Sequence, residues 1–447
     1  SKIGGLMPIN SFLYPGAKFI PGYEVANSCR FDDGSSDTLT RTFGSSGNQK
    51  TFTFSGWYKR SETGVEHRIF SSHNTGSPAG YASMHFHTSD DLIIFNYNGS
   101  SSYQYLRTDR KFRDLSAWYH IVLAYDTTQS TASNRVKLYI NGVQETSFSS
   151  ETTPSQNADL YFNDNVIHYV SGGDTANGSN PYSGYMAEIV LVDGQQLDPT
   201  SFGEFDEDSP NIWKPKNVSG LTFGNNGFYL DFENASSLGA DVSGNSNNFT
   251  VNNLTSADQS TDTCTNNFCT LNPLKNNTTL SEGNLKCVTG AGTSQVATST
   301  FAPNAGKWYW EVKVDDATAL MVGVADITAT LANSDWAASG GYYYYNTGVT
   351  YNNNSSSSYG DSFTDGDIIG VALDLDNNKI YFSKNGTFQN SGDPTSGSSG
   401  TGAAFTLTGQ YFPALSNGSS HNGATAQMNF GSPSFSISSG NADANGH

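Results

Sequence analysis

Hydrolysis of a polysaccharide is the first reaction to test against the side chains of this sequence. A glycosidase holds two carboxyl groups in one cleft, so that one acts as acid and the other as nucleophile or base. Glu188 has no second carboxylate until Asp193. Glu311 shares a predicted strand face with Lys313 and Asp315, and the lysine lies between the two acids. We therefore expect no catalytic residues and no enzyme, with a glycan depolymerase kept as the alternative.

Two histidines on one predicted strand, His85 and His87, could form part of a transition-metal site. Residues two apart in a strand point to the same side, so both imidazoles could reach one ion. A metal would need a third ligand, for example His67 or His73, and the sequence does not fix which. A half-exposed strand face that carries two histidines is the commoner explanation of such a pair.

A polar loop that contains Asp241, Ser243 and Asn245 is the candidate for a calcium site. Oxygen-bearing side chains at alternating loop positions are typical of calcium loops. The same residue types also stabilise turns by bonding to their own backbone. A comparable run from Asp374 to Asn378 leads straight into a predicted strand, which indicates a hairpin turn. No cofactor is expected, and calcium at the Asp241 loop is the alternative.

A cluster of aromatic residues in the last third of the chain is the candidate ligand-binding surface. Its members are Trp336, Tyr342, Tyr343, Tyr344, Tyr345 and Tyr351. In a strand, consecutive tyrosines alternate between the two faces, so two would point inward and two outward. The outward pair with Trp336 could form a flat platform that stacks on sugar rings or anchors an interface. The alternative is that all six pack within the core and across strands.

The first 24 residues predict an extended arm. They contain three prolines, which exclude a regular helix, and too many apolar side chains for a solvated tail. The candidate docking residues are Leu6, Ile9, Phe12, Tyr14 and Phe19. We expect the arm to dock on a partner chain or on a copy of itself, and folding against its own first domain is the alternative.

Alternation of apolar and polar residues predicts an all-β protein. Residues 367–386 are apolar at every second position, and their closing Asn385-Gly386 pair is a strong two-residue hairpin signal. Similar alternation occurs in segments 51–57, 119–126, 136–140 and 185–193. No window shows a sustained 3.6-residue period. We expect two antiparallel β-sandwiches of the jelly-roll type in tandem.

Composition excludes several classes of function. The 447 residues include 22 Lys and Arg against 41 Asp and Glu, a net charge of −19, which disfavours nucleic acid and anionic membranes. No apolar run approaches 18 residues, so no membrane insertion is expected. The cysteines, Cys29, Cys264, Cys269 and Cys287, fit no zinc spacing and are expected to be ordinary thiols, with a bridge among the last three as the alternative.

The last third of the chain resembles the SPRY family. The blocks that carry the resemblance are 307–314 (KWYWEVKV), 321–325 (MVGVA), 367–386, 411–415 (YFPAL) and 428–431 (MNFG), in the order of that family. The resemblance covers residues 268–433. It implies a bent sandwich of two antiparallel sheets that binds partners through loops and has no enzymatic activity.

An earlier region resembles laminin-G-like, or concanavalin A-like, domains. The blocks are 51–59 (TFTFSGWYK), 118–121 (WYHI), 136–143 (VKLYINGV) and 184–189 (GYMAEI), and the resemblance covers residues 25–205. It implies a sandwich fold but no particular ligand, because that superfamily includes lectins, adhesion modules and glycosidases. Residues 206–267 would then be a connector with added strands, and residues 434–447 a polar tail.

The two domains in this order, together with segments such as FYLDFEN at 228–234, are similar to structural proteins of tailed phages, especially marine ones. This resemblance implies a component of the virion surface, either a tail fibre or a fibre or decoration on the capsid. Its expected partners are other virion proteins, copies of itself in a homo-oligomer, and a host-surface glycan or protein. The alternative is a purely structural capsid decoration without a receptor.

Overall fold

The structure is a computed structural model that describes residues 22–74, 80–99, 101–173, 179–290, 295–328, 340–417 and 423–437. The chain forms two compact units, and the boundary between them lies between Asn267 and Phe268. Strands and short 3₁₀ turns make up the regular structure of the described residues, which contain no α-helix. The predicted all-β fold class is therefore confirmed. Nothing in the described part is a helix long and apolar enough to cross a membrane.

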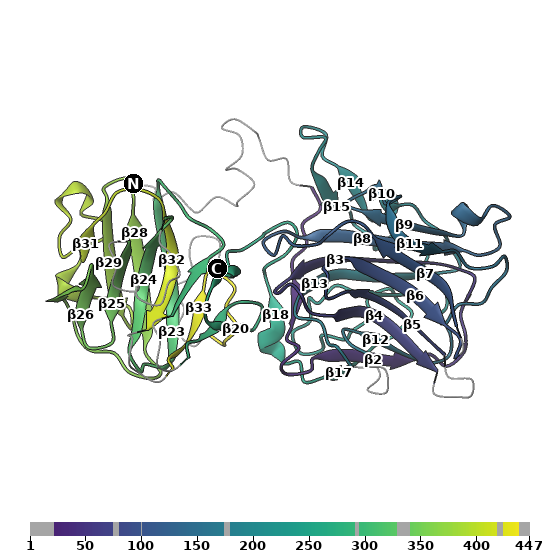
Figure 1. The fold of residues 1–447 in the computed structure, drawn as a ribbon, viewed down its shortest axis with the longest axis horizontal. Coiled ribbons are helices and arrows are strands. Elements are labelled where there is room, and N and C mark those ends of the chain that lie inside the picture. The colour runs from purple at the N-terminus through teal and green to yellow at the C-terminus, as the bar shows by residue number, and fades with distance from the viewer. Residues whose placement is uncertain are drawn as a thin grey trace. The chain divides into compact units, whose positions relative to one another are not determined.

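The first unit contains two antiparallel sheets, called here the β3 sheet and the β5 sheet (Figure 1). In spatial order the β3 sheet consists of β10 (Val143–Gln144), β9 (Val136–Ile140), β8 (Tyr119–Asp126), β3 (Thr51–Arg60), β13 (Gly184–Asp193), β1 (Ser28–Phe31) and β18 (Gln259–Ser260), and β16 (Phe228–Leu230) also pairs with β13. The β5 sheet consists of β11 (Phe148–Thr152), β7 (Ser102–Thr108), β6 (Leu92–Tyr97), β5 (Gly80–Phe86), β4 (His67–Asn74), β12 (Ile167–Val170), β2 (Thr38–Thr42) and β17 (Thr250–Asn252).

The core of the first unit lies between these two sheets. Phe54 of β3 stacks on Phe70 of β4 with ring centroids 4.1 Å apart, and Met84 and Leu123 are buried in the same cluster. In strands such as β3 and β8, alternate residues contribute to this cluster because successive side chains of a strand point to opposite faces. In these strands the sequence alternation predicted which residues face the core.

Other segments of the first unit cover much of the outer face of the β3 sheet. Val190 of β13 packs there against Phe202 and Phe223, which follow β13 in the sequence. Farther along the same face, Trp57 and Tyr185 form a second buried cluster. The covering segment includes β14 (Gly203–Phe205) and β15 (Trp213–Pro215), which pair with each other. Segment 206–267, expected to connect the two sandwiches, thus adds its strands β15 to β18 to the first unit.

The second unit also contains two antiparallel sheets, the β24 sheet and the β28 sheet. The β24 sheet consists of β19 (Leu271–Asn276), β22 (Val296–Ser299), β32 (Tyr411–Asn417), β24 (Leu320–Asp326), β25 (Gly341–Tyr345), β26 (Val349–Asn352) and β27 (Ser355–Ser358). The β28 sheet consists of β20 (Thr279–Ser281), β21 (Lys286–Val288), β33 (Thr425–Asn429), β23 (Lys307–Asp316), β28 (Ile368–Asp374), β29 (Lys379–Lys384) and β30 (Thr387–Phe388), and β31 (Phe405–Thr406) pairs with β29. Trp310, Val371 and Leu415 are among the buried residues of the core between them.

The predicted hairpins at residues 367–386 are present. Strand β28 pairs with β29, and β29 pairs with β30 across Asn385 and Gly386, whose φ angles are 49° and 81°. A two-residue turn of this kind needs positive φ at both positions, which asparagine and glycine tolerate. The four cysteines are all free thiols, so no bridge joins Cys264, Cys269 and Cys287.

Candidate functional site

The outer face of the β5 sheet carries a row of aromatic side chains. This outer aromatic row is Tyr81 of β5, Phe95 and Tyr97 of β6, and Tyr105 of β7. Register places Tyr97 opposite Tyr81 and Tyr105 opposite Phe95. Paired residues lie on the same face, and the alternate residues of these strands point into the core. The three strands therefore hold four aromatic rings on one continuous surface.

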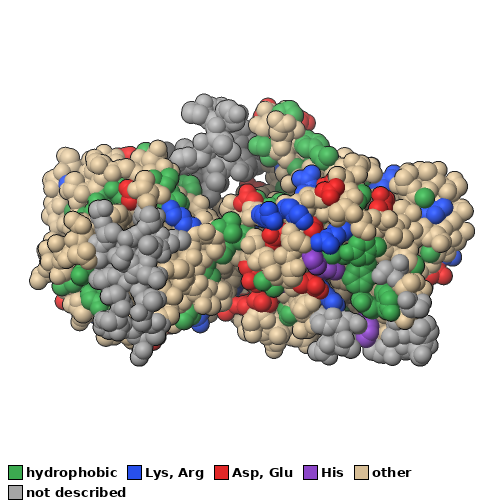
Figure 2. Space-filling view, viewed as in Figure 1, with side chains coloured by type: hydrophobic (Ala, Val, Ile, Leu, Met, Phe, Trp, Pro, Cys, Tyr) green, Lys and Arg blue, Asp and Glu red, His purple; other side chains and the backbone are tan. Residues whose placement is uncertain are grey.

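The rings of the outer aromatic row contact one another and remain partly exposed. Tyr81 meets Phe95 edge-on with centroids 5.2 Å apart, and it lies 5.2 Å from Tyr97. His85 meets Phe95 edge-on at 5.7 Å. Burial lowers the pKa of His85 to about 4, so this imidazole is neutral at neutral pH. The surface is therefore apolar and largely uncharged. Figure 2 shows hydrophobic side chains gathered beside histidine and basic ones on the face of the first unit that is in view.

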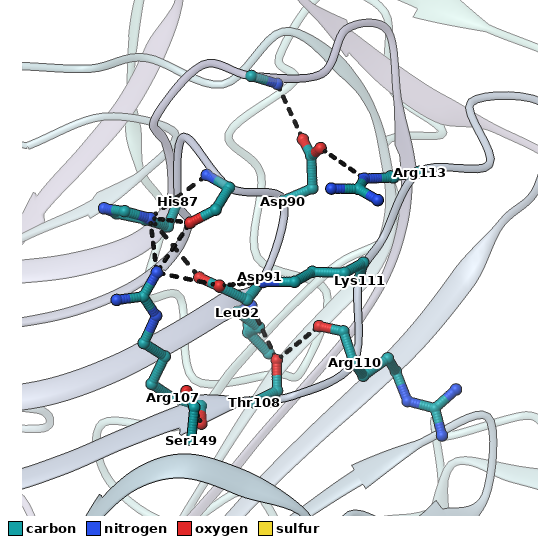
Figure 3. Close-up of polar contacts among 12 residues, drawn as sticks. His87, Asp90, Asp91, Leu92, Arg107, Thr108, Arg110, Lys111, Arg113 and Ser149 are labelled. Carbon is teal, nitrogen blue, oxygen red and sulfur yellow. Dashed lines mark hydrogen bonds and ion pairs between the residues drawn. The ribbon is translucent and has the colours of Figure 1, made fainter.

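A charged edge borders the aromatic row at the end of β7 (Figure 3). Arg107 lies opposite Ile93 on the same face, and its Nη2 donates to Oδ2 of Asp91 at 3.1 Å. Lys111 Nζ donates to the same oxygen at 2.5 Å. Burial alone would raise the pKa of Asp91, but the hydrogen bonds from Lys111 and Arg107 bring it below its ordinary value. Asp91 therefore stays ionised and holds both cations at the border of the row.

The neighbouring Asp90 organises a second part of the charged edge. Its Oδ1 accepts from the backbone N–H of Gly64 at 2.8 Å, and its Oδ2 accepts from Nε of Arg113 at 3.0 Å. The Arg113 side chain is 64% exposed, so most of its guanidinium is free to meet a ligand. The edge thus presents hydrogen-bond donors to solvent while buried carboxylates hold their side chains in place.

A shallow cavity of about 400 Å³ lies at the ends of β4, β6 and β7. Its lining includes Asn74, Asn98, Tyr103 and Tyr161. Amide groups beside tyrosine rings offer both hydrogen bonds and stacking surface to a small polar ligand. The cavity therefore adds a polar pocket at the opposite end of the strands from the charged edge.

The two histidines of the predicted pair point to the same side of the sheet, as the sequence predicted. Met84 and Phe86 are fully buried in the core, and His85 and His87 lie on the outer face. The two histidines are not part of a metal-ligand cluster among the described residues. Instead His87 lies beside Arg107 of the charged edge, and its Nδ1 is 2.8 Å from the hydroxyl of Ser89.

The four consecutive tyrosines of the second unit alternate as predicted, but they do not form an open platform. Tyr342 and Tyr344 point into the core between the sheets, and Tyr344 stacks on Phe382. Tyr343 points the other way, yet it is 1% exposed among side chains of neighbouring strands. The expected platform is therefore reduced, in the described residues, to the partly exposed Tyr345 and Tyr351, whose rings meet edge-on at 6.4 Å.

The Asp241 loop shows the contacts of a turn. Both carboxylate oxygens of Asp241 accept hydrogen bonds, Oδ1 from the N–H of Tyr229 and Ser243, and Oδ2 from the N–H of Asn247 and the hydroxyl of Ser243. The side-chain amide of Asn245 donates to two backbone carbonyls. These bonds occupy the oxygens of Asp241 that a calcium ion would need.

Glu188 and Glu311, the glutamates considered above as catalytic candidates, both make hydrogen bonds to neighbouring side chains. Glu188 is buried and bonded to tyrosine hydroxyls, and Glu311 accepts from the Tyr309 hydroxyl at 2.9 Å and from Asn429. The remaining candidates lie outside the described residues. These are Trp336 and the arm residues Leu6, Ile9, Phe12, Tyr14 and Phe19.

The outer aromatic row was missed by the sequence reasoning, although a signal was present. In segments 92–97 (LIIFNY) and 102–108 (SYQYLRT), aromatic residues occupy the positions opposite to the core-facing ones. An amphipathic strand normally places polar residues there. A search of the sequence for strands with aromatic residues at the outward positions would have identified this surface.

Two domain-family models match the sequence. Residues 33–197 match the concanavalin A-like lectin/glucanases superfamily, and residues 307–433 match the SPRY domain. A search of curated proteins found no match.

Several solved structures are similar to parts of the chain. The SPRY domain of human HERC1 is similar over 36% of this chain and 98% of its own, with 20% identity and a TM-score of 0.30. A native heptameric SAP-like pentraxin from Limulus polyphemus is similar over 39% of this chain and 80% of its own, with 15% identity and a TM-score of 0.28. The two family matches and the sheets described above lead to one conclusion: the chain carries a concanavalin A-like domain followed by a SPRY domain, two antiparallel β-sandwiches in tandem.

Proposed function

We propose that this chain is a non-enzymatic binding and adhesion protein whose first unit binds a glycan across the outer face of the β5 sheet. The observation that carries the proposal is the outer aromatic row, in which four partly exposed rings share one sheet face. Flat aromatic faces stack on the apolar sides of sugar rings. The charged edge and the polar cavity at the two ends of the strands supply hydrogen-bond partners for sugar hydroxyl groups.

The covering of the opposite sheet supports the choice of face. Residues that follow β13 bury the outer surface of the β3 sheet, including Val190 and Tyr229. Among the described residues of the first unit, most of the outer face of the β3 sheet is covered, whereas the outer aromatic row of the β5 sheet stays partly exposed. The resemblance to laminin-G-like domains is in keeping with a binding role.

Glycan binding is tested with the purified full chain on an array of bacterial capsular polysaccharides and lipopolysaccharide glycans. Tyr97→Ala removes one partly exposed ring, and the loss of a stacking contact of about 1.4 kcal/mol weakens binding roughly tenfold. Tyr345→Ala, a matched change on the second unit, leaves binding unchanged. Unaltered melting temperatures show that both variants fold.

The outcomes separate the candidate surfaces. Binding that survives both Tyr97→Ala and Phe95→Ala overturns the assignment to the outer aromatic row. Binding lost with Tyr345→Ala instead assigns the ligand to the SPRY domain. A chain that binds no glycan but captures a defined host-surface protein would replace the glycan proposal.

We also propose that the bound glycan is not hydrolysed. In support, Glu188 is buried, and its carboxylate accepts hydrogen bonds from Tyr23 and Tyr229. Release of reducing sugar by the pure chain, and its loss in Glu188→Gln, would instead support a glycan depolymerase.

We place the chain on the surface of a phage particle, as a tail fibre or a capsid fibre or decoration, on the basis of its resemblance to phage structural proteins. Display of many copies, as a homo-oligomer, would multiply weak single sites. Binding to nucleic acid and insertion into membranes are not part of the proposal. Immunogold electron microscopy of the particle tests the location, and absence of gold from intact particles contradicts it. A labelled particle whose purified chain binds no glycan and no host protein would indicate a decoration without a receptor.

A further inference from the structure

Three possible metal ligands meet at one end of the first unit. Asp33, Glu62 and His67 each place one ligand atom within 4.8 Å of the ligand atoms of the other two. Within the described ranges, no other group of three or more histidine, cysteine or acidic side chains has such spacing. The group includes no residue of the Asp241 loop and neither His85 nor His87.

Sheet topology explains why the two acids meet. Phe31 at the end of β1 and Arg60 at the end of β3 both pair with Gly184, one on each side of β13. Asp33 and Glu62 each follow two residues later, so both leave the sheet at the same end. His67 then begins β4 in the other sheet. Residues far apart in sequence are therefore fixed at the same rim by strand register.

His67 is the buried member of the group: its side chain is only 1% exposed. Neither Nδ1 nor Nε2 makes a hydrogen bond with the described residues. A buried polar group normally has a partner, because burial without one is destabilising. Nε2 faces Oε1 of Glu62 at 3.0 Å, but an N–H on this nitrogen would not point at that oxygen.

The arrangement of His67 and Glu62 suits two ligands of one ion better than a hydrogen-bonded pair. Two ligand atoms of a tetrahedral Zn²⁺ ion, each about 2.1 Å from it, are about 3.4 Å apart, so a small movement of the accessible Glu62 side chain from the present 3.0 Å would admit the ion. In that arrangement the nitrogen lone pair points at the metal and away from the neighbouring oxygen. The lack of a hydrogen bond between Nε2 of His67 and Glu62 agrees with this arrangement. Asp33 and Glu62 are both accessible to solvent, so an ion can enter and water can complete its coordination.

We propose that Asp33, Glu62 and His67 bind a divalent transition-metal ion, with Zn²⁺ the best match. One imidazole and two carboxylates form a ligand set that Zn²⁺ accepts, whereas Ca²⁺ prefers oxygen ligands alone. The ion would also relieve the repulsion between the two acids. It would tie the turn after β1 to the loop between β3 and β4, and so join both sheets at this rim.

The test is calorimetric titration of the metal-free full chain with ZnCl₂, MnCl₂ and CaCl₂ in separate experiments. We expect one Zn²⁺ per chain at this site, weaker Mn²⁺ binding, and a melting temperature that rises with added Zn²⁺ because the ion binds only the folded chain. Asp33→Asn and Glu62→Gln change accessible side chains with little change of shape. Each should weaken Zn²⁺ binding by at least roughly tenfold.

His87→Gln is the matched control, because His87 is a partly exposed histidine outside the group. It should leave Zn²⁺ affinity unchanged. The Co²⁺-loaded chain provides a spectroscopic check, since its visible absorption depends on the nitrogen ligand and should change in His67→Gln. No Zn²⁺ binding, binding unaffected by Asp33→Asn and Glu62→Gln, or stabilisation by CaCl₂ alone would each overturn the proposal.

Discussion

Both carboxylate oxygens of Glu188 lie within hydrogen-bond distance of the hydroxyl of Tyr229, at 2.9 and 2.8 Å. Tyr23 adds a contact to the same carboxylate at 3.2 Å. Glu188 has a φ of 53° at a bulge in β13, where the pairing with β3 shifts between Ala187 and Val190. The bulge turns this side chain toward β16 and the segment before β1. A buried carboxyl group thus fastens two distant segments to the outer face of the β3 sheet.

The stability of the first unit should depend on the protonation of Glu188. Burial raises the pKa of Glu188 from 4.5 to about 7, although the tyrosine hydrogen bonds act in the opposite direction. Between these values the folded chain binds more protons than the unfolded chain, so this group's contribution to the free energy of unfolding falls as pH rises from about 4.5 to about 7. The full effect is on the order of 3 kcal/mol. Urea unfolding across this range should show a flatter pH dependence for Glu188→Gln than for the natural chain.

Other groups also titrate in this range, so the comparison needs a control. Glu151→Gln on the exposed strand β11 removes one carboxylate without touching the cluster. Its pH dependence should match that of the natural chain. Equal slopes for Glu188→Gln and the natural chain would show that Glu188 is not the responsible group.

Removal of one member of the buried ion pair of Lys59 and Asp262 should strongly destabilise the first unit. Lys59 Nζ lies 2.7 Å from Asp262 Oδ2, and the two side chains are 1% and 2% exposed. Asp262→Ala leaves a buried ammonium without its counter-ion and should lower the free energy of unfolding by about 3–5 kcal/mol. The matched change at the exposed pair of Lys50 and Asp159, Asp159→Ala, should cost less than about 1 kcal/mol. Similar losses in the two variants, measured by urea unfolding, would contradict this account.

The first unit should need the returning segment in order to fold. A piece that spans residues 25–205 lacks β16, β17 and β18, which pair with β13, β2 and β1. It also exposes the apolar outer face of the β3 sheet. We expect residues 22–267 to melt cooperatively in calorimetry and residues 25–205 to aggregate or melt without cooperativity. Equal melting of the two pieces would show that the segment is an accessory. Residues 268–437 should melt cooperatively alone.

On the phage particle proposed above, we propose that residues 1–21 dock the chain, so their removal should abolish its incorporation and leave both units folded. This deletion keeps Tyr23, which contacts Glu188, and Val25, whose N–H donates to Thr265 at 3.0 Å, so the first unit retains the contacts that anchor the segment before β1. A full-length chain with Leu6, Phe12 and Phe19 changed to serine should show the same defect, because burial of apolar side chains would drive the proposed docking. Particle composition by gel and mass spectrometry measures the result. Normal incorporation of both variants would show that residues 1–21 are not needed for docking.

The sequence by itself determined several of the strands and the direction of their side chains. Segments 119–126 and 136–140 were predicted with the bounds that β8 and β9 have, and the turn at Asn385 and Gly386 was predicted from its residue types. Met84 and Phe86, which alternate with His85 and His87, face the core as period-two alternation requires. These features depend on period-two alternation and on local backbone preferences, which neighbouring residues specify.

Only the tertiary structure decided which outward faces stay open and which distant residues meet. The alternation that directs Tyr343 outward is the same as that of Phe95, yet neighbouring strands bury Tyr343 and leave Phe95 partly exposed. The covering of the β3 sheet depends on residues far along the chain. Likewise Asp33 and Glu62 meet because both β1 and β3 pair with β13. Strand order and register arise from packing between distant segments, and the local alternation of residues does not specify them.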